Sequence, residues 1–127
     1  MELLMKEKNI EISYDAKNKY LYCNWIGFQN EESIMKSGGH ILHFLKEKEA
    51  SKVLNDNTKV TGPWQDAAKW TNTVWFPDMI NNGLKFFAWI FSPNIFAQLS
   101  AKKAMPKSDS VRSFNSMEEA QTWLLKQ

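Results

Sequence analysis

The sequence predicts an α/β fold, in which an N-terminal β-hairpin is followed by alternating helices and strands that form a mostly parallel sheet. Residues 9–15 alternate between apolar and polar, and an aromatic-rich strand at 20–26 follows after a short polar link, as in an antiparallel hairpin. Residues 84–91 are apolar on both alternating faces, which is typical of a central strand covered by helices on each side. Helix and strand patterns alternate after the hairpin, which indicates parallel strands joined by right-handed crossovers.

Helix start signals place the expected helices between these strands. Asn30 is a suitable N-cap for the first helix, because two glutamates follow it and oppose the positive end of the helix dipole. Gly38 falls on the apolar face of that helix, where we expect close helix–strand packing rather than a gap that admits a ligand. Ser92 is the expected cap of a later helix, and Ser116 begins a capping box with Glu119.

The segment between the third strand and the next helix is the first candidate site. A short apolar strand at 52–54 is followed by a polar stretch, 55–64, which we expect to form a loop. Loops between a strand and a helix are where open α/β sheets place ligands and switches. Ordinary turn and cap chemistry is the alternative explanation for the same residue types. The binding or regulatory residues of this loop would be Asn55, Asp56, Asn57, Thr58 and Thr61.

The helix after this loop carries the second candidate site. It begins near Trp64, and Pro77 is expected to break or kink it. One packed face cannot easily hide four large rings, so at least one ring should be exposed, line a pocket or form an interface. The ligand or partner surface would consist of Trp64, Trp70, Trp75 and Phe76, and simple partial burial is the alternative.

Composition limits the classes of function. The 127 residues suit one domain, 1–127, and the formal charge is +2. Acidic and basic residues are interspersed, so no basic stripe is present for nucleic acid. The only local basic cluster consists of Lys102, Lys103 and Lys107, and we expect it to be a solvated helix end rather than a phosphate or membrane patch. The N-terminus does not resemble a signal peptide, no run is long enough to cross a bilayer, and Cys23 is the single cysteine. We therefore expect a cytoplasmic protein without a transmembrane segment, in which Cys23 is a small buried residue.

No residue pattern points to catalysis, a cofactor or a metal. His40 and His43 lie three residues apart, but no third ligand at matching spacing supports a metal site, so both are expected on the surface. The sequence shows no catalytic triad spacing, no phosphate-binding glycine loop and no paired catalytic carboxylates. An enzyme would need Asp56 as a general base in a polar pocket, which nothing in the sequence indicates.

The order of elements resembles the STAS domain, and more closely the small bacterial SpoIIAA-like proteins that are described as STAS/SEC14-like. After the opening hairpin, the resemblance rests on residues 53–57 before the helix start at 62–64, and on 86–93, 111–114 and 118–124. The last two stretches match the family's closing pattern of an aromatic strand end, an acidic helix start and a Trp-Leu pair. The match covers nearly the whole chain and implies a SpoIIAA-like fold.

The resemblance also implies a class of function. Anti-sigma factor antagonists of this type carry a phosphorylated serine at the helix start after the third strand. This chain has no serine there, and Thr58 and Thr61 stand nearest. We therefore expect a non-enzymatic binding or regulatory module that acts on a protein partner through the loop 55–64 and the following helix, with homodimerisation as an option. The alternative is a carrier of a small apolar or lipid-like ligand in a Trp-lined pocket, because related SEC14-type folds hold lipids beneath helices.

Overall fold

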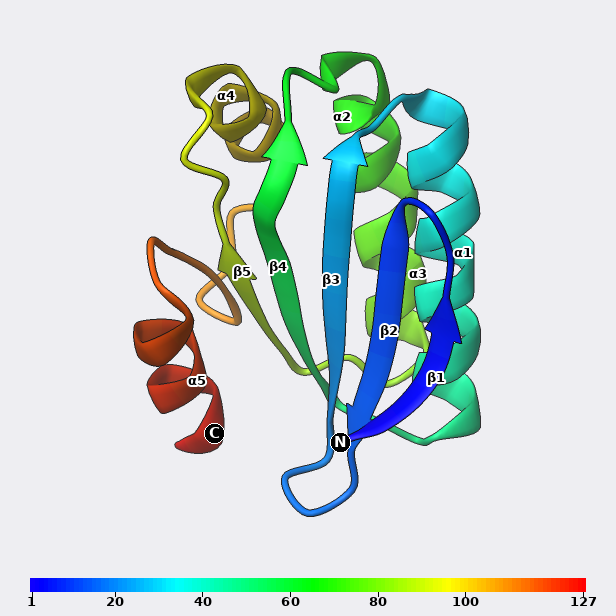
Figure 1. Ribbon diagram of the computed structural model, residues 1–127. Coiled ribbons are helices and arrows are strands. Elements are labelled where there is room, and N and C mark those ends of the chain that lie inside the picture. The colour runs from blue at the N-terminus through cyan, green and yellow to red at the C-terminus, as the bar shows by residue number, and fades with distance from the viewer.

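The protein is built around one six-stranded sheet (Figure 1), and the computed structural model describes all residues from 1 to 127. The strands follow one another across the sheet in chain order. They are β1 (Glu2–Lys6), β2 (Ile10–Asp15), β3 (Tyr20–Phe28), β4 (Lys52–Thr61), β5 (Phe86–Ile90) and β6 (Val111–Phe114). Strands β1 to β3 pair antiparallel and β3 to β6 pair parallel, which confirms the hairpin and the mostly parallel sheet.

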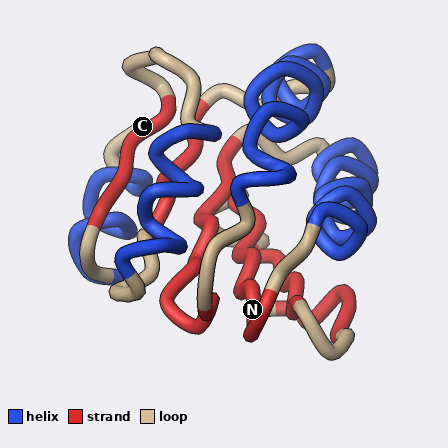
Figure 2. Tube along the Cα trace, turned by 90° about the horizontal axis from the view of Figure 1, so that it is seen from above, coloured by secondary structure: helices blue, strands red, loops and turns tan.

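Helices cover the two faces of the sheet unequally. The helical elements are α1 (Glu31–Glu47), η1 (Gln65–Ala67), α2 (Ala68–Trp70), η2 (Thr71–Trp75), α3 (Phe76–Asn81), α4 (Ile95–Ala104) and α5 (Met117–Leu125). Right-handed crossovers between successive neighbours place their helices on one face, and a cluster of 25 buried residues lies under α1, η1 to α3 and α4. Helix α5 packs on the opposite face over a cluster of six, so the main core lies on the first face. Figure 2 shows the same layers from above.

Strand β5 lies between β4 and β6 and is buried from both sides. Phe87 and Trp89 belong to the large cluster, whereas Ala88 and Ile90 belong to the small one. The prediction of a central strand with apolar residues on both faces is confirmed. None of the helices combines the length and the apolar character that spanning a bilayer requires.

Two of the three expected helix caps are confirmed. The Asn30 and Ser116 side chains accept hydrogen bonds from the backbone N–H three residues further on, at 2.8 and 3.2 Å. Ser92 is not a cap, because its hydroxyl donates to the Val60 carbonyl at 2.8 Å. Asn94 caps α4 instead, since its side-chain oxygen accepts from two backbone N–H groups of the first turn.

Two features of the elements differ from what the sequence indicated. Strand β1 is an edge strand of the sheet that the sequence did not indicate. Residues 2–6 contain three successive apolar residues and lack the alternating pattern of a strand with one exposed face. Pro77 does not break the helix, since α3 continues to Asn81 and holds Pro77 in its first turn. Pro77 follows closely on the π-helical turn η2 and lies inside a continuous helical segment. The chain departs from α-helical geometry earlier, in the π-helical turn η2.

The expected loop at 55–64 is the largest error, because β4 runs through most of it. Two residues of β4, Asn57 and Thr58, stand opposite a single residue of β3, which is a β-bulge. A bulge shifts the alternation of side chains by one residue, so that Val60 rather than Lys59 is buried beyond it. The polar run is therefore a bulged strand, and the loop that remains before η1 is short.

The one cysteine is fully buried in β3, as expected. Burial raises the pKa of the Cys23 thiol well above its ordinary value. The folded protein therefore keeps a proton that the unfolded chain releases above a pH of about 8.5. The stability that this thiol contributes is fully present below that pH and is lost as the pH rises above it.

We expect the free energy of unfolding to fall between about pH 8.5 and 10, with a slope that approaches ~1.4 kcal/mol per pH unit. Urea unfolding at a series of pH values measures this slope. The variant Cys23→Ala is the control and should lose most of the slope in this window. An identical slope in the two proteins would show that another group is responsible.

Candidate ligand-binding site

A small cavity lies between the sheet and the helices that cover the main core. Its volume is ≈ 20 Å³, and a buried water needs roughly 10–15 Å³. Much of its wall is formed by the indole rings of Trp25, Trp64, Trp75 and Trp89. The rest of the wall consists of Gln29, Ile34, Gly38, Asn55, Asn57, Val60 and Thr71. No charged side chain lines the cavity, so it suits an uncharged occupant.

Strand β4 supplies the amide groups of this site. Asn55 and Asn57 lie two residues apart, so their side chains share one face of the strand and both line the cavity. The Asn55 side-chain oxygen accepts a hydrogen bond from Trp25 Nε1 at 2.7 Å. By contrast, Asn57 Oδ1 and Trp89 Nε1 are buried without any hydrogen-bond partner. A buried unpaired group costs about 1–3 kcal/mol, so these two atoms call for an occupant that pairs with them.

Residues 64–81, which we call the cover, close the cavity on the helical side. The cover passes through a 3₁₀ turn, a short α-helical turn and the π-helical turn η2 before it reaches α3. In η2 the Phe76 N–H donates to the Thr71 carbonyl, five residues earlier. Such π-helical turns are rare and occur frequently at functional sites.

Three hydrogen bonds fasten the cover to its neighbours. Trp75 Nε1 donates to the Gly38 carbonyl of α1 at 2.8 Å. On the other side, Asn72 Nδ2 donates to a carbonyl at the end of α4 at 3.2 Å. The Trp64 backbone N–H donates to the Ser100 hydroxyl of α4 at 2.9 Å. The cover thus bridges α1 and α4 across the cavity.

The four rings of the predicted aromatic surface are mostly hidden. Trp64, Trp75 and Phe76 are buried, whereas Trp70 is half-buried and packs against the edge of the core. The wider π-helical turn changes the angular positions of its residues, and Thr71 is buried together with Trp75 and Phe76. Of the four rings, only Trp64 and Trp75 line the cavity.

Gly38 allows α1 and the cover to approach each other closely. A Cβ atom at this position would lie 3.1 Å from the Trp70 ring and 3.1 Å from Trp75 Nε1. The expected close packing is therefore present, but its partner is the cover rather than a strand. The neighbouring Gly39 is exposed and has no atom within 4 Å of such a Cβ.

The other three candidate residues of the expected loop, Asp56, Thr58 and Thr61, do not line the cavity. Asp56 is buried on the other face of β4, where it accepts a hydrogen bond from the Tyr22 hydroxyl at 2.6 Å. It also accepts from the Thr58 backbone N–H at 2.9 Å and from the Thr58 hydroxyl. These contacts hold the bulge closed as a local side-chain turn. Thr58 and Thr61 themselves are exposed.

The contact with Asp56 also changes the acidity of the Tyr22 hydroxyl. Burial and the hydrogen bond to the Asp56 carboxylate raise the pKa of Tyr22 well above its ordinary value. Both effects favour the protonated phenol, which is the form that donates to the carboxylate. The hydrogen bond from the Tyr22 hydroxyl to the buried Asp56 carboxylate therefore has a structural role.

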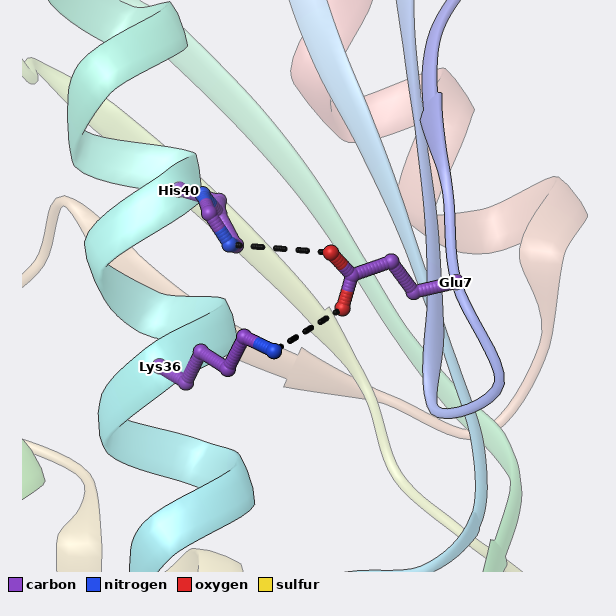
Figure 3. A network of polar contacts seen from close by, with 3 residues as sticks. All are labelled: Glu7, Lys36 and His40. Carbon is purple, nitrogen blue, oxygen red and sulfur yellow. Dashed lines mark ion pairs between the residues drawn. The ribbon is translucent and has the colours of Figure 1, made fainter.

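The two histidines lie on α1, away from the cavity. Figure 3 shows Glu7, in the turn between β1 and β2, reaching toward His40 and Lys36. The distances from its carboxylate are 3.9 Å to His40 Nε2 and 3.7 Å to Lys36 Nζ. His43 is exposed, and its Nε2 lies 3.0 Å from Oε2 of Glu47, one helical turn further on. No group of three or more His, Cys, Asp or Glu side chains is arranged so that it could hold a metal ion.

Sequence reasoning missed two of the tryptophans that matter most at the site. Trp25 and Trp89 lie on β3 and β5, which flank β4 on either side. The alternation of each strand was readable from the sequence, and it places both indoles on the face that the helices cover. The missing step was to recognise β4 between them as a strand with two asparagines on that same face.

The comparisons with known proteins concern the fold. No family model matches the chain, and no curated protein matches it. Among solved structures, the chain is similar to an uncharacterized protein from the DUF3478 family with a SpoIIAA-like fold, from Shewanella loihica PV-4. The sequence identity is 18%, the TM-score is 0.57, and the match covers 95% of this chain and 98% of that chain. The protein thus has a SpoIIAA-like fold, as the resemblance implied.

Proposed function

We propose that residues 1–127 form one non-enzymatic binding domain whose ligand is a small, mostly apolar and uncharged molecule. The observation that carries the proposal is the pair of buried, unpartnered groups at the Trp-lined cavity, Trp89 Nε1 and Asn57 Oδ1. A buried polar group without a partner costs about 1–3 kcal/mol, and a ligand that hydrogen-bonds to both groups would offset this cost. The flat indole walls favour a flat ligand.

The two unpartnered groups define the polar chemistry of the ligand. Trp89 Nε1 is a donor, so the ligand needs an acceptor, and Asn57 Oδ1 is an acceptor, so the ligand needs a donor. A neutral amide or an N–H heterocycle carries both groups on one small frame. A charged ligand is disfavoured, because the cavity wall contains no charge that would compensate its loss of hydration.

Binding requires the cover to move. A cavity of ≈ 20 Å³ holds water but no organic molecule, since small-molecule sites have volumes of roughly 300–1,000 Å³. The cover contains short turns of three helix types, and three hydrogen bonds fasten it to α1 and α4. Displacing it away from the sheet would enlarge the space between Trp64 and Trp89, whose rings stack at 6.2 Å.

The same substitution at two neighbouring asparagines separates a structural role from a binding role. We expect Asn55→Leu to lower the free energy of unfolding by about 1–3 kcal/mol, because it leaves Trp25 Nε1 unpaired. We expect Asn57→Leu to leave stability unchanged or to raise it, because Asn57 Oδ1 has no partner to lose. Urea unfolding of both variants measures the difference. Equal losses in the two variants would mean that Asn57 has a structural role.

Ligand binding by the wild type and by Asn57→Leu tests the binding role of Asn57. A ligand that donates to Asn57 should be lost from Asn57→Leu, although this variant folds at least as well as the wild type. Mass spectrometry under native conditions detects such a ligand by its mass alone, whatever its chemical identity. If the wild type and Asn57→Leu carried the same small-molecule mass, the ligand would not depend on Asn57 and the site would be misplaced.

A second candidate function is regulated binding of a protein partner at the end of β4. The observation that favours it is the exposure of Thr58 and Thr61 next to a β-bulge, a feature found often beside functional sites. Phosphorylation at either residue would add nearly two negative charges to a surface near Lys59. Intact mass of the protein from its own host tests this, because the absence of any phosphorylated form would remove its support.

A further inference from the structure

The outer face of α4 exposes three large apolar side chains side by side. Ile95, Phe96 and Leu99 are 63%, 60% and 55% exposed. The opposite side of the helix is fully packed, because Ala97, Ser100, Ala101 and Ala104 are buried. In Figure 1, α4 lies beyond the ends of the strands, at the end of the molecule toward which β3 and β4 point. The packing of the protein itself leaves this face without a partner.

Lysines follow the apolar residues on the same helix. Lys102 and Lys103 are exposed in its last turn, and Lys107 follows in the loop after it. From residue 79 to 108 the chain contains four lysines and no carboxylate, although the formal charge of the whole protein is only +2. None of these lysines takes part in the ion pairs of the protein. Within the cover, η1 and α2 pack beside α4, and their Asp66 and Lys69 have opposite charges that cancel.

We propose that the outer face of α4, formed by Ile95, Phe96, Leu99, Lys102 and Lys103, docks onto an anionic lipid membrane. An anionic bilayer supplies both kinds of partner that this face lacks, namely hydrocarbon for the apolar side chains and phosphate or carboxylate groups for the lysines. A second copy of the chain offers the same lysines and no carboxylate on this face, so it does not neutralise them. None of these residues lines the cavity, so the docking face is independent of the proposed ligand.

Vesicle sedimentation tests the docking face with the full chain. We expect the wild type to bind vesicles of phosphatidylcholine mixed with phosphatidylserine, to bind pure phosphatidylcholine weakly, and to dissociate as salt screens the charges. Lys102→Gln combined with Lys103→Gln should weaken binding to the anionic vesicles roughly 30-fold. Phe96→Ser combined with Leu99→Ser should weaken it about tenfold or more. All four side chains are exposed, so these variants should fold normally.

A matched control removes the same charge elsewhere. Lys17→Gln combined with Lys46→Gln changes two exposed lysines, in the β2–β3 turn and on α1, and leaves α4 intact. We expect this variant to bind like the wild type. An equal loss in the control would show that net charge alone drives binding and would overturn the proposal. If the wild type did not bind anionic vesicles, the proposal would also be overturned. An acidic protein would then be the better candidate partner for this face.

Discussion

Replacing Trp89 by alanine is expected to lower the free energy of unfolding by about 3–5 kcal/mol, the usual cost of truncating a large buried aromatic side chain. Trp89 is 2% exposed and lies in the middle of the aromatic core. Its ring centroid lies 5.5 Å from that of Phe87, 5.7 Å from that of Phe91 and 6.2 Å from that of Trp64. The change removes all of these contacts and enlarges the existing cavity. Denaturant unfolding measures the loss.

Trp123 provides the control for this truncation. It lies on α5, is half-buried and contacts the rings of Phe86 and Phe114, so Trp123→Ala should cost only about 1–2 kcal/mol. Added indole should raise the melting temperature of Trp89→Ala by several degrees, because it refills an enclosed apolar space, and should leave Trp123→Ala unchanged. Equal losses in the two variants would contradict the central position of Trp89. If Trp89→Ala does not fold, Trp89→Phe offers a milder truncation.

Asp56→Ala is expected to lower the free energy of unfolding by about 2–4 kcal/mol. The change leaves the Tyr22 hydroxyl and the Thr58 backbone N–H without their acceptor, in a place where Asp56 is 6% exposed. It also removes the contact that holds the bulge of β4. Asp56 thus supports the fold, and a change there would disturb partner binding only through stability. Denaturant unfolding at neutral pH measures the effect.

Two milder variants separate the contributions at Asp56. Tyr22→Phe removes one donor and should cost about 1 kcal/mol, while Asp56→Asn keeps an acceptor and should cost less than Asp56→Ala. Removing the carboxylate should also lower the pKa of Tyr22 toward its ordinary value of about 10, because the hydrogen bond and the charge of Asp56 help to raise it. Ultraviolet titration of Asp56→Asn detects this shift. Wild-type stability in Asp56→Ala would contradict a role of this carboxylate in holding the bulge.

The fold class was accessible from the sequence because several local signals agree with the final structure. The alternation at 9–15, the Asn30 cap and the two-sided apolar strand at 84–91 each reflect burial or capping that neighbouring residues determine. Strand β4 was not accessible in the same way. Its polar residues are those of a loop, and tertiary contacts, not propensity, keep Asn55, Asp56 and Asn57 buried in a strand.

The candidate site was predictable only in part. The expectation that the rings of the helix after β4 serve a pocket placed Trp64 and Trp75 at the cavity. It failed to anticipate that Phe76 is buried in the core, because a regular helix cannot turn successive residues inward as the π-helical turn does. The cavity itself depends on residues from five separate elements, β3, α1, β4, η2 and β5, and from two connecting segments. Only the register of β4 against β3 and β5 brings Asn55 and Asn57 beside Trp25 and Trp89.

The most direct test of the proposed ligand site is native mass spectrometry of the protein purified from its own host, with Asn57→Leu expressed and purified in the same way. A small-molecule mass that is present in the wild type, lost on denaturation and absent from Asn57→Leu is the predicted result. Intact mass of the denatured wild type, recorded alongside, reports whether Thr58 or Thr61 carries a phosphate. A wild-type protein whose native mass equals that of the bare chain would contradict the account, because the unpartnered groups at Trp89 and Asn57 would then have no ligand to bind.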